Sequence, residues 1–366
     1  AAQPTIAPAA PGGPVTTVQT PPGAAGAGGP SGQLPVYGGA ASLTKVFNPD
    51  ISLIGDFLGA VGRDPVRPVP VLEMHESELG VQAIIDPFAR GDFFLSFGEE
   101  GVDLEEGYIT FTSLPGGLLA RAGKMRSSFG RVNMMHNHML PWVDRPLVTE
   151  NLLGGEEGIT DAGLSLSRLL PAPKDIFLEF TGQVFRGDAA GGVFQASQRS
   201  DVSFVGHLRG NHDLSEATNL DLGFSYARGH NDEGDSFVTQ LHGLDATLRW
   251  KPLRGPRYRS FILRTELAWS RRQQPLATQR AFGWFGSLDY QLSRRWFAGG
   301  RYDWSERGEN AAQHDSGASV LFTFWPSEFS QVRWQYRFTN YAEGREGNEL
   351  RFQFLFNLGA HGAHPF

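Results

Sequence analysis

The sequence predicts an all-β fold, a transmembrane antiparallel β-barrel of about sixteen strands. The last strand-like run, residues 350–358, alternates apolar and polar side chains, and residues 332–339 repeat the pattern. Such alternation places one face of a strand against apolar surroundings and the other against water. Because no stretch approaches the roughly 18 consecutive apolar residues of a membrane helix, strands are the elements expected to cross a bilayer.

The composition agrees with a barrel. Of the 366 residues only 40% are hydrophobic, yet 12% are aromatic and 46 are glycine, and the mean hydropathy is −0.27. A barrel needs an apolar residue only at every second strand position, so modest hydropathy with many aromatics is typical of it. The absence of cysteine excludes disulfides and thiol chemistry, and the net charge of −7 argues against a nucleic-acid partner.

The chain divides into two parts. Residues 1–34 are rich in Pro, Ala and Gly and carry almost no charge, which predicts a disordered periplasmic tether that could hold a periplasmic partner or peptidoglycan. Residues 35–366 form the predicted barrel domain. The chain begins Ala-Ala-Gln without methionine, so we expect a mature protein whose signal peptide has been removed.

The expected strands follow one another as short alternating runs separated by turn residues. Their outward apolar rows are Ile51, Leu53, Phe57; Leu79, Val81, Ala83, Ile85; Phe93, Leu95, Phe97; Ile109, Phe111; Leu164, Leu166; Ile176, Leu178, Phe180; Val202, Phe204, Leu208; Leu220, Leu222, Phe224, Tyr226; Leu244, Ala246, Leu248, Trp250; Leu263, Leu267, Trp269; Phe282, Trp284, Leu288, Tyr290; Trp296, Tyr302, Trp304; Val320, Phe322, Phe324; and the two final runs. A fifth run spans residues 118–126 with an unclear phase. An even number of about sixteen strands is expected of a bacterial barrel.

The connections alternate between two kinds. Tight turns at 114–117, 171–174, 292–295 and 326–329 are interpreted as periplasmic, and longer polar loops at 186–199, 229–236 and 307–317 as extracellular. This parity predicts that both termini lie on the periplasmic side of a Gram-negative outer membrane. A soluble β-sandwich would also alternate. Six tryptophans favour the barrel, because they can form girdles at the lipid headgroups: Trp250, Trp269, Trp296, Trp304, Trp325 and Trp334.

The inward rows are polar and charged, as expected for a sixteen-stranded barrel with an aqueous lumen. The predicted pore-lining residues are His207, Arg209, Asp245, Arg249, Arg264, Glu266, Arg301, Asp303, Arg333, Arg337 and Arg351. Arginines on successive strands could form a basic strip that favours anions. The alternative to a basic strip is that these arginines are neutralised by acids nearby, Arg264 by Glu266 and Arg301 by Asp303.

Residues 129–159 are too long and too apolar for an ordinary exposed hairpin, so we expect this segment to fold into the lumen and narrow it. Cations facing acids there would create a transverse field that decides selectivity. The predicted pore-constriction residues are Lys124, Arg126, Arg131, Asp144, Arg145, Glu150, Glu156 and Glu157.

The run Gly-Lys-Met-Arg-Ser-Ser-Phe-Gly at 123–130 is followed by Trp-Val-Asp-Arg-Pro-Leu-Val at 142–148 and Asp-Ala-Gly-Leu-Ser-Leu-Ser at 161–167. About forty-five residues here resemble the Gly-x-Phe-Lys-x-Pro-Phe-Gly and Met-Glu-Arg-x-Leu segments of phosphate-selective porins of the O and P type. The resemblance implies a sixteen-stranded, trimeric channel with a lumen lined by arginine and lysine.

Two histidine pairs suggest metal binding, but neither has an identifiable third ligand. His136 with His138 and His361 with His364 are therefore expected to be solvated loop and tail residues, and no metal or other cofactor is predicted. Ser203 and His207 both face the lumen, so a rim-type hydrolase site is not expected and the protein is predicted not to be an enzyme.

These observations lead to one functional hypothesis and one alternative. The first is an outer-membrane porin for passive diffusion of small ions or solutes, with a preference for anions such as phosphate. The alternative is a structural barrel that anchors a periplasmic partner or peptidoglycan through residues 1–34. The expected partners are outer-membrane lipid, the permeating solute and two further copies of the chain.

Overall fold

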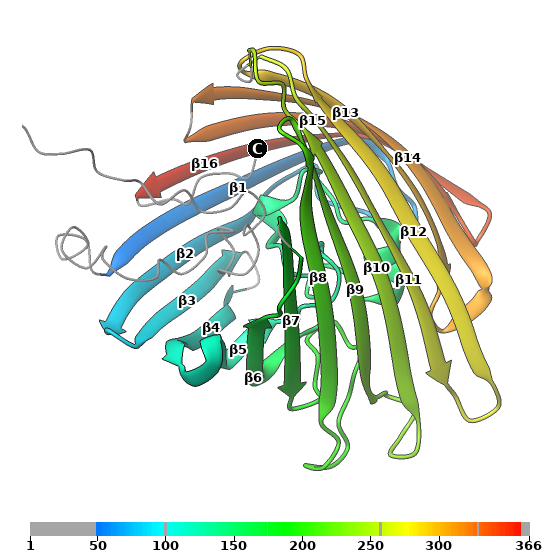
Figure 1. Ribbon diagram of the computed structural model, residues 1–366. Coiled ribbons are helices and arrows are strands. Elements are labelled where there is room, and N and C mark those ends of the chain that lie inside the picture. The colour runs from blue at the N-terminus through cyan, green and yellow to red at the C-terminus, as the bar shows by residue number, and fades with distance from the viewer. Residues whose placement is uncertain (1–48, 99–100, 174, 256–257, 328, 360–366) are drawn as a thin grey trace, which may run out of the picture.

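The computed structural model describes residues 49–98, 101–173, 175–255, 258–327 and 329–359. Sixteen antiparallel strands, each paired with the next along the chain, close into a barrel through pairing of the first strand with the last (Figure 1). The strands are β1 (Asp50–Arg63), β2 (Leu72–Asp86), β3 (Ala89–Gly98), β4 (Gly101–Leu114), β5 (Leu118–Arg126), β6 (Thr160–Leu169), β7 (Ile176–Phe185), β8 (Ser203–Ser215), β9 (Thr218–His230), β10 (Val238–Trp250), β11 (Phe261–Gln273), β12 (Thr278–Gln291), β13 (Trp296–Arg307), β14 (Asn310–Ser327), β15 (Ser330–Tyr341) and β16 (Arg345–Gly359). The predicted tether at 1–34, the start of the barrel domain at residue 35, and His361 and His364 lie outside the described residues.

The last two strands confirm the alternation read from the sequence. On their outer face Val332 pairs with Phe354 and Trp334 with Phe352, whereas the inward Gln335 pairs with Arg351. Large apolar side chains are exposed along the outer faces of the strands, Val320 by 67%. This outer surface is apolar because a barrel in a bilayer meets hydrocarbon there, and its strands leave no unpaired edge.

The connections gather at two ends of the barrel, which we call the short-turn end and the loop end. The short-turn end holds the β4–β5 turn, where Pro115–Gly117 form the 3-10 helix η3, and the loop end holds the β5–β6 connection. The prediction of a long loop at 307–317 is wrong, because Arg307 pairs with Asn310 and the two strands continue to a two-residue turn. These residues form paired strands instead of a loop, because polar residues are also compatible with the part of a strand that extends beyond the membrane.

Aromatic side chains form two belts on the outer face. Trp269, Phe282 and Trp304 follow one another across β11–β13 nearer the loop end, with ring centroids 5.2 and 6.0 Å apart. Nearer the short-turn end Trp296, Phe322, Trp334 and Phe352 make a second series. Trp325 is a correction to the predicted girdles: it shares the inward face of β14 with the buried Leu321 and Thr323 and lines a lumenal cavity.

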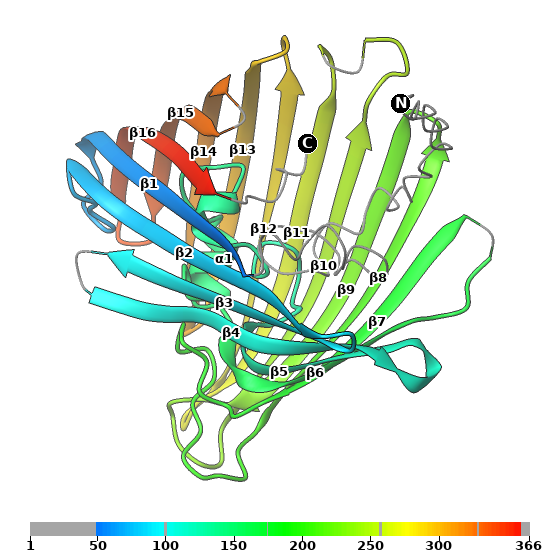
Figure 2. The same cartoon turned by 90° about the vertical axis from the view of Figure 1, so that its left-hand side faces the viewer.

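The β5–β6 connection, residues 127–159, lies inside the barrel and is called the lumenal loop below. It contains the 3-10 helix η4 (Asn137–Met139) and the helix α1 (Leu147–Leu152), which is seen within the barrel in Figure 2. No helix among the described residues is long and apolar enough to span a membrane. The fold therefore combines a closed wall with a folded segment packed inside it.

Candidate functional site

The lumenal loop has an apolar core that is shared with the barrel wall. Phe129, Trp142 and Val148 are at most 1% exposed and belong to one cluster with wall residues such as Leu241 and Phe285. The Trp142 and Phe285 rings meet edge to face, with centroids 5.0 Å apart. Inward strand positions that would normally be polar are apolar here because they meet the loop rather than water.

Glycines on the inner wall provide recesses for the loop. A side chain at Gly243 of β10 would lie 3.0 Å from the Phe129 ring, and one at Gly283 of β12 would lie 2.9 Å from Val148. Both distances are too short for ordinary packing. The wall is thus shaped to receive these two loop side chains.

The turn at Gly130 is fixed by polar groups of the wall. Gly130 has a φ of 60°, a conformation that favours glycine, and its N–H donates to Ser225 Oγ at 2.8 Å. The N–H groups of Arg131 and Val132 donate to Glu266 at 3.3 and 3.2 Å. Glu266 is therefore a wall contact for the loop backbone.

Asp144 joins the loop to β13 and β15 of the wall. Its carboxylate lies 3.0 Å from Arg301 and 3.0 Å from Arg337 and accepts a hydrogen bond from Gln335 at 2.5 Å. Burial alone would raise the pKa of Asp144, but Arg301 and Arg337 outweigh burial and hold that pKa well below its usual range. Arg301 also bonds to Asp303 at 2.7 Å, so Asp144 completes a buried ion-pair network.

Two further arginines hold loop carbonyl groups. Arg333 of β15 donates to the carbonyl oxygens of Leu140 and Trp142 at 3.0 and 3.1 Å. Arg145, only 2% exposed, donates to the carbonyl oxygens of Val132 and Met135. Arg145 was predicted to face the pore, but it stabilises the interior of the loop instead.

A histidine–carboxylate cluster joins the loop to β2 and β4. His136 is fully buried; its Nδ1 contacts Glu78 and lies 2.9 Å from Glu105, and its Nε2 lies 2.9 Å from Glu106. Burial by itself would lower the pKa of His136, but the carboxylates of Glu78 and Glu105 outweigh burial and raise it well above the usual value. His138 is 4% exposed, with Nδ1 3.8 Å from Glu78.

These burials overturn the expectation of solvated loop histidines, because carboxylates of β2 and β4 surround them. The signal was present in the sequence. Glu76 and Glu78 stand in the inward phase of β2, two residues apart, opposite the outward row that begins at Leu79. Once the loop covers such an inward acidic pair, the buried carboxylates need a compensating cation or proton.

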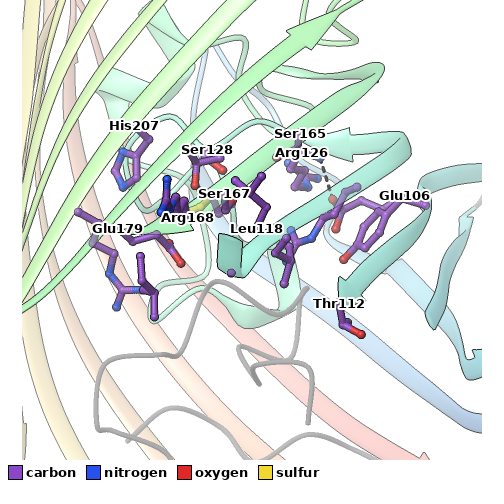
Figure 3. Close-up of a pocket in the computed structure, with 18 residues that line it drawn as sticks. Glu106, Thr112, Leu118, Arg126, Ser128, Ser165, Ser167, Arg168, Glu179 and His207 are labelled. Atoms are coloured by element: carbon purple, nitrogen blue, oxygen red, sulfur yellow. Dashed lines mark hydrogen bonds between the residues drawn. The ribbon is translucent and has the colours of Figure 1, made fainter. Parts of the chain in front are cut away.

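Space remains between the loop and the wall. A cavity of about 280 Å³ opens beside β4–β8, lined by groups that include Arg121, Arg126, Glu179, His207 and Arg209. Figure 3 shows Glu106 and Arg126, joined by a hydrogen bond, across this space from Glu179 and His207. The lining carries charges of both signs, so the cavity suits polar solutes.

A smaller cavity, of about 60 Å³, lies beneath the loop. It is lined by Arg131, Arg249, Arg264 and Arg333 together with loop residues. Asp221 lies 3.5 Å from Arg131 and 3.9 Å from Arg249, and Arg264 contacts Asp289. Four guanidinium groups around one space give this part of the lumen a positive potential.

The structure places the other predicted site residues as follows. The prediction that Lys124 lines the pore constriction is wrong. The preceding residue, Gly123, pairs with the buried Tyr108 on the inward face, so Lys124, which pairs with Gly107 and Ala162, points outward and lies 3.3 Å from Asp103. Arg126 lies 3.7 Å from Glu105 and donates to carbonyl oxygens of Glu156 and Glu157. Glu150 lies 3.8 Å from Arg67, and Glu156 3.8 Å from His75.

The predicted pore-lining residues share the inward faces of their strands. His207 bonds to Ser225 at 2.8 Å, Arg209 to Asp221 at 2.9 Å and Arg351 to Glu349 at 2.8 Å, whereas Asp245 lies beside Gly223. Of the two neutralising pairs considered, Arg301 with Asp303 is present, but Arg264 contacts Asp289 in place of Glu266. The arginines are thus mostly paired, and four of them, Arg131, Arg249, Arg264 and Arg333, line the cavity beneath the loop.

Comparison with known proteins agrees with this architecture. No family model matches the chain. An uncharacterized protein of Aquifex aeolicus (strain VF5) is 29% identical over 388 residues, which cover 88% of this chain and 81% of the relative. Similar solved structures include an anion-selective porin from Comamonas acidovorans, with a TM-score of 0.59, 9% identity, and coverage of 84% of this chain and 98% of that one.

Two other similar structures have the same level of identity. OprB of Pseudomonas putida has a TM-score of 0.57 and 9% identity and covers 88% of this chain and 97% of its own. OmpT, an outer membrane protein of Vibrio cholerae, also has a TM-score of 0.57 at 9% identity, with coverage of 84% and 97%. The chain therefore has the sixteen-stranded fold of outer-membrane barrels.

Proposed function

We propose that this protein is an outer-membrane porin through which small polar solutes diffuse passively, with a preference for anions. The observation that carries the proposal is the group of Arg131, Arg249, Arg264 and Arg333 around a cavity beneath the lumenal loop. In a narrow water-filled passage such charges act more strongly than in bulk water, so they attract anions and repel cations. The anion-selective porin among the similar structures supports the same direction.

The proposal includes a trimer in a Gram-negative outer membrane with both termini on the periplasmic side. A trimer form of OmpT of Vibrio cholerae is among the similar structures. In this arrangement the short-turn end faces the periplasm and the loop end faces the exterior. The loop then narrows the passage between the two compartments, and no catalytic step is involved.

A specific observation favours a second function, a closed barrel that serves as an anchor. The loop is packed against the wall through Phe129, Trp142 and Val148, all of them buried. If this packing leaves no continuous passage, the barrel would hold a periplasmic partner or peptidoglycan through its N-terminal segment. Conductance distinguishes the two functions.

The test is single-channel conductance and reversal potential of the purified protein in a planar bilayer with asymmetric KCl. A steady pore whose reversal potential shows anion preference is expected, and Arg249→Gln should shift that potential toward zero. Arg271→Gln is the matched control, because Arg271 is an exposed arginine in the outward phase of β11. Cation preference, or equal effects of the two variants, contradicts the assignment of selectivity to the arginines, and absence of conductance supports the anchor.

The same assay tests whether three of the predicted pore-constriction residues, Arg126, Arg131 and Arg145, control ion preference. Replacement of all three by Ala should alter the reversal potential through Arg126 and Arg131, which line cavities. Replacement of Arg145 alone is expected to act through loop stability, because its guanidinium group bonds to loop carbonyls.

A further inference from the structure

The histidine–carboxylate cluster between β2 and the lumenal loop has the composition of a metal site. Glu76 and Glu78 of β2 and His136 and His138 of the loop each offer one ligand atom, and these four atoms lie within 4.8 Å of one another. All four residues are buried, with at most 6% of their surface exposed. Two segments that are about sixty residues apart in the chain thus bring a complete ligand set to one point.

The cluster carries more negative than positive charge. Four carboxylates, those of Glu76, Glu78, Glu105 and Glu106, surround His136, and Arg126 lies 3.7 Å from Glu105. With Arg126 positive and both imidazoles neutral, as metal ligation requires, four negative charges face one positive charge, an excess of three. Buried excess charge is costly unless a cation or protons compensate it.

An independent observation comes from Glu76. This side chain is 94% buried, since 6% of its surface is exposed, and its Oε1 accepts no hydrogen bond from any of the described residues. The same carboxyl group lies within hydrogen-bonding distance of that of Glu105, so either a shared proton or a cation must compensate the two carboxylates. A buried carboxyl group that has one unbonded oxygen and lies within 4.8 Å of the ligand atoms of two imidazoles fits a position next to a cation.

The contacts of His136 also suit metal ligation. In the structure Nδ1 contacts Glu78 directly, so a bound ion would replace the Nδ1 proton and move these two atoms apart, while Nε2–H still donates to Glu106 at 2.9 Å. Carboxylates commonly fix the tautomer of a ligating histidine in this manner. His138 Nδ1 lies 3.8 Å from Glu78 Oε2, close to the roughly 3.4 Å that separates two ligand atoms of a tetrahedral ion with bonds of about 2.1 Å.

We propose that Glu76, Glu78, His136 and His138 bind one zinc ion, or a similar divalent transition metal, that fastens the lumenal loop to β2. Two imidazoles with two carboxylates suit zinc, whereas calcium and magnesium favour sites made of oxygen alone. Four protein ligands complete a tetrahedral shell, so the ion has a structural role. Its charge of two offsets most of the negative charge of the cluster.

The test uses the full chain, stripped with EDTA and then dialysed against zinc chloride. We expect one zinc per chain by elemental analysis, with affinity measured by competition with a chromogenic chelator. Glu76→Gln and His138→Ala should each weaken zinc binding at least tenfold. His242→Ala is the matched control, because His242 lies on the outer face against Tyr226, and it should bind zinc as the unaltered chain does.

Cobalt provides a second measurement that does not depend on affinity. Bound Co²⁺ should show the visible absorption of a tetrahedral nitrogen and oxygen site, and these bands should be lost in His138→Ala. Circular dichroism confirms that each variant retains the barrel. If the unaltered chain binds no zinc, protons neutralise the cluster and the proposal is overturned; equal binding by Glu76→Gln, His138→Ala and the unaltered chain overturns it as well. Metal binding is measured directly, so neither result bears on the proposed porin.

Discussion

Replacement of Asp144 by Asn should release the lumenal loop from the wall. The change keeps the shape of the side chain but removes the charge that faces Arg301 and Arg337 at 3.0 Å each. Removing one partner of a buried ion pair costs about 3–5 kcal/mol, because the other charge stays buried. Since Arg301 keeps Asp303 at 2.7 Å, we expect the lower end of this range, about 3 kcal/mol. At about 1.4 kcal/mol per tenfold change, the detached loop becomes about a hundredfold more populated.

Limited proteolysis measures this population. Chymotrypsin can cut after Trp142 only when the loop leaves the lumen, because Trp142 is 1% exposed in the docked state. The cleavage rate, followed by mass spectrometry, tracks the open population when opening and closing are fast. We expect a rate about a hundredfold higher in Asp144→Asn, with Asp235→Asn on an exposed connection as the control. An unchanged cleavage rate would refute the assignment of Asp144 as an anchor.

The same anchor predicts a pH response. The pKa of Asp144 is lowered in the folded protein: burial opposes ionisation, but Arg301 and Arg337 outweigh it. A carboxyl group with a depressed pKa stabilises the fold fully above its unfolded pKa of about 3.9, and this contribution is lost as the pH falls through the depressed value. The loss of unfolding free energy caused by Asp144→Asn, measured in urea, should therefore stay constant between pH 7 and pH 5 and shrink only in stronger acid. A loss that already shrinks at pH 6 would contradict this account.

Three further changes probe the docking of the loop. Gly283→Val places a side chain where α1 packs and should destabilise loop docking by about 1–3 kcal/mol. This loss is measured as faster cleavage after Trp142. The control is Gly286→Val, which lies three residues along β12 in the outward phase and should not change the cleavage rate. Trp142→Ala removes a fully buried ring and should lower the free energy of unfolding by about 3–5 kcal/mol, and a loss below 1 kcal/mol would show that the ring is not packed as described. Glu150→Gln should stabilise the protein at pH 7 but not below about pH 4, because burial raises the pKa of Glu150 and so penalises its charged form. Urea unfolding at both pH values measures the change in the free energy of unfolding. A gain in that free energy that persists in acid would contradict the prediction.

The strands could be predicted because alternation is a local property of the sequence. Residues 332–339 and 350–358 show both faces of a strand, and their pairing follows from adjacency in the chain. The position of the lumenal loop also followed from its length and apolar content. The prediction of a loop at 307–317 failed because strands beyond the membrane zone need no apolar row, so polar residues there resemble a loop.

The partners of charged groups could not be predicted, because they depend on how the loop lies in the lumen. Asp144 bonds to residues more than 150 positions later in the chain, and nothing local indicates that choice. Lys124 was misplaced because the phase of β5 is weakly marked, and only pairing with Gly107 and Ala162 defines it. The carboxylates around His136 were detectable as an acidic row facing inward on β2, but the apolar row at 79–85 was the stronger signal.

The recesses at Gly243 and Gly283 imply that loop and wall must be inherited together. A loop grafted from another barrel would meet hollows shaped for Phe129 and Val148, so a chimera needs the facing wall positions as well. Excising the loop would also leave Arg301, Arg333 and Arg337 without Asp144 and the loop carbonyls that they hold. An engineered barrel without its loop would therefore be wider, and it would present these three guanidinium groups to whatever solute enters the lumen.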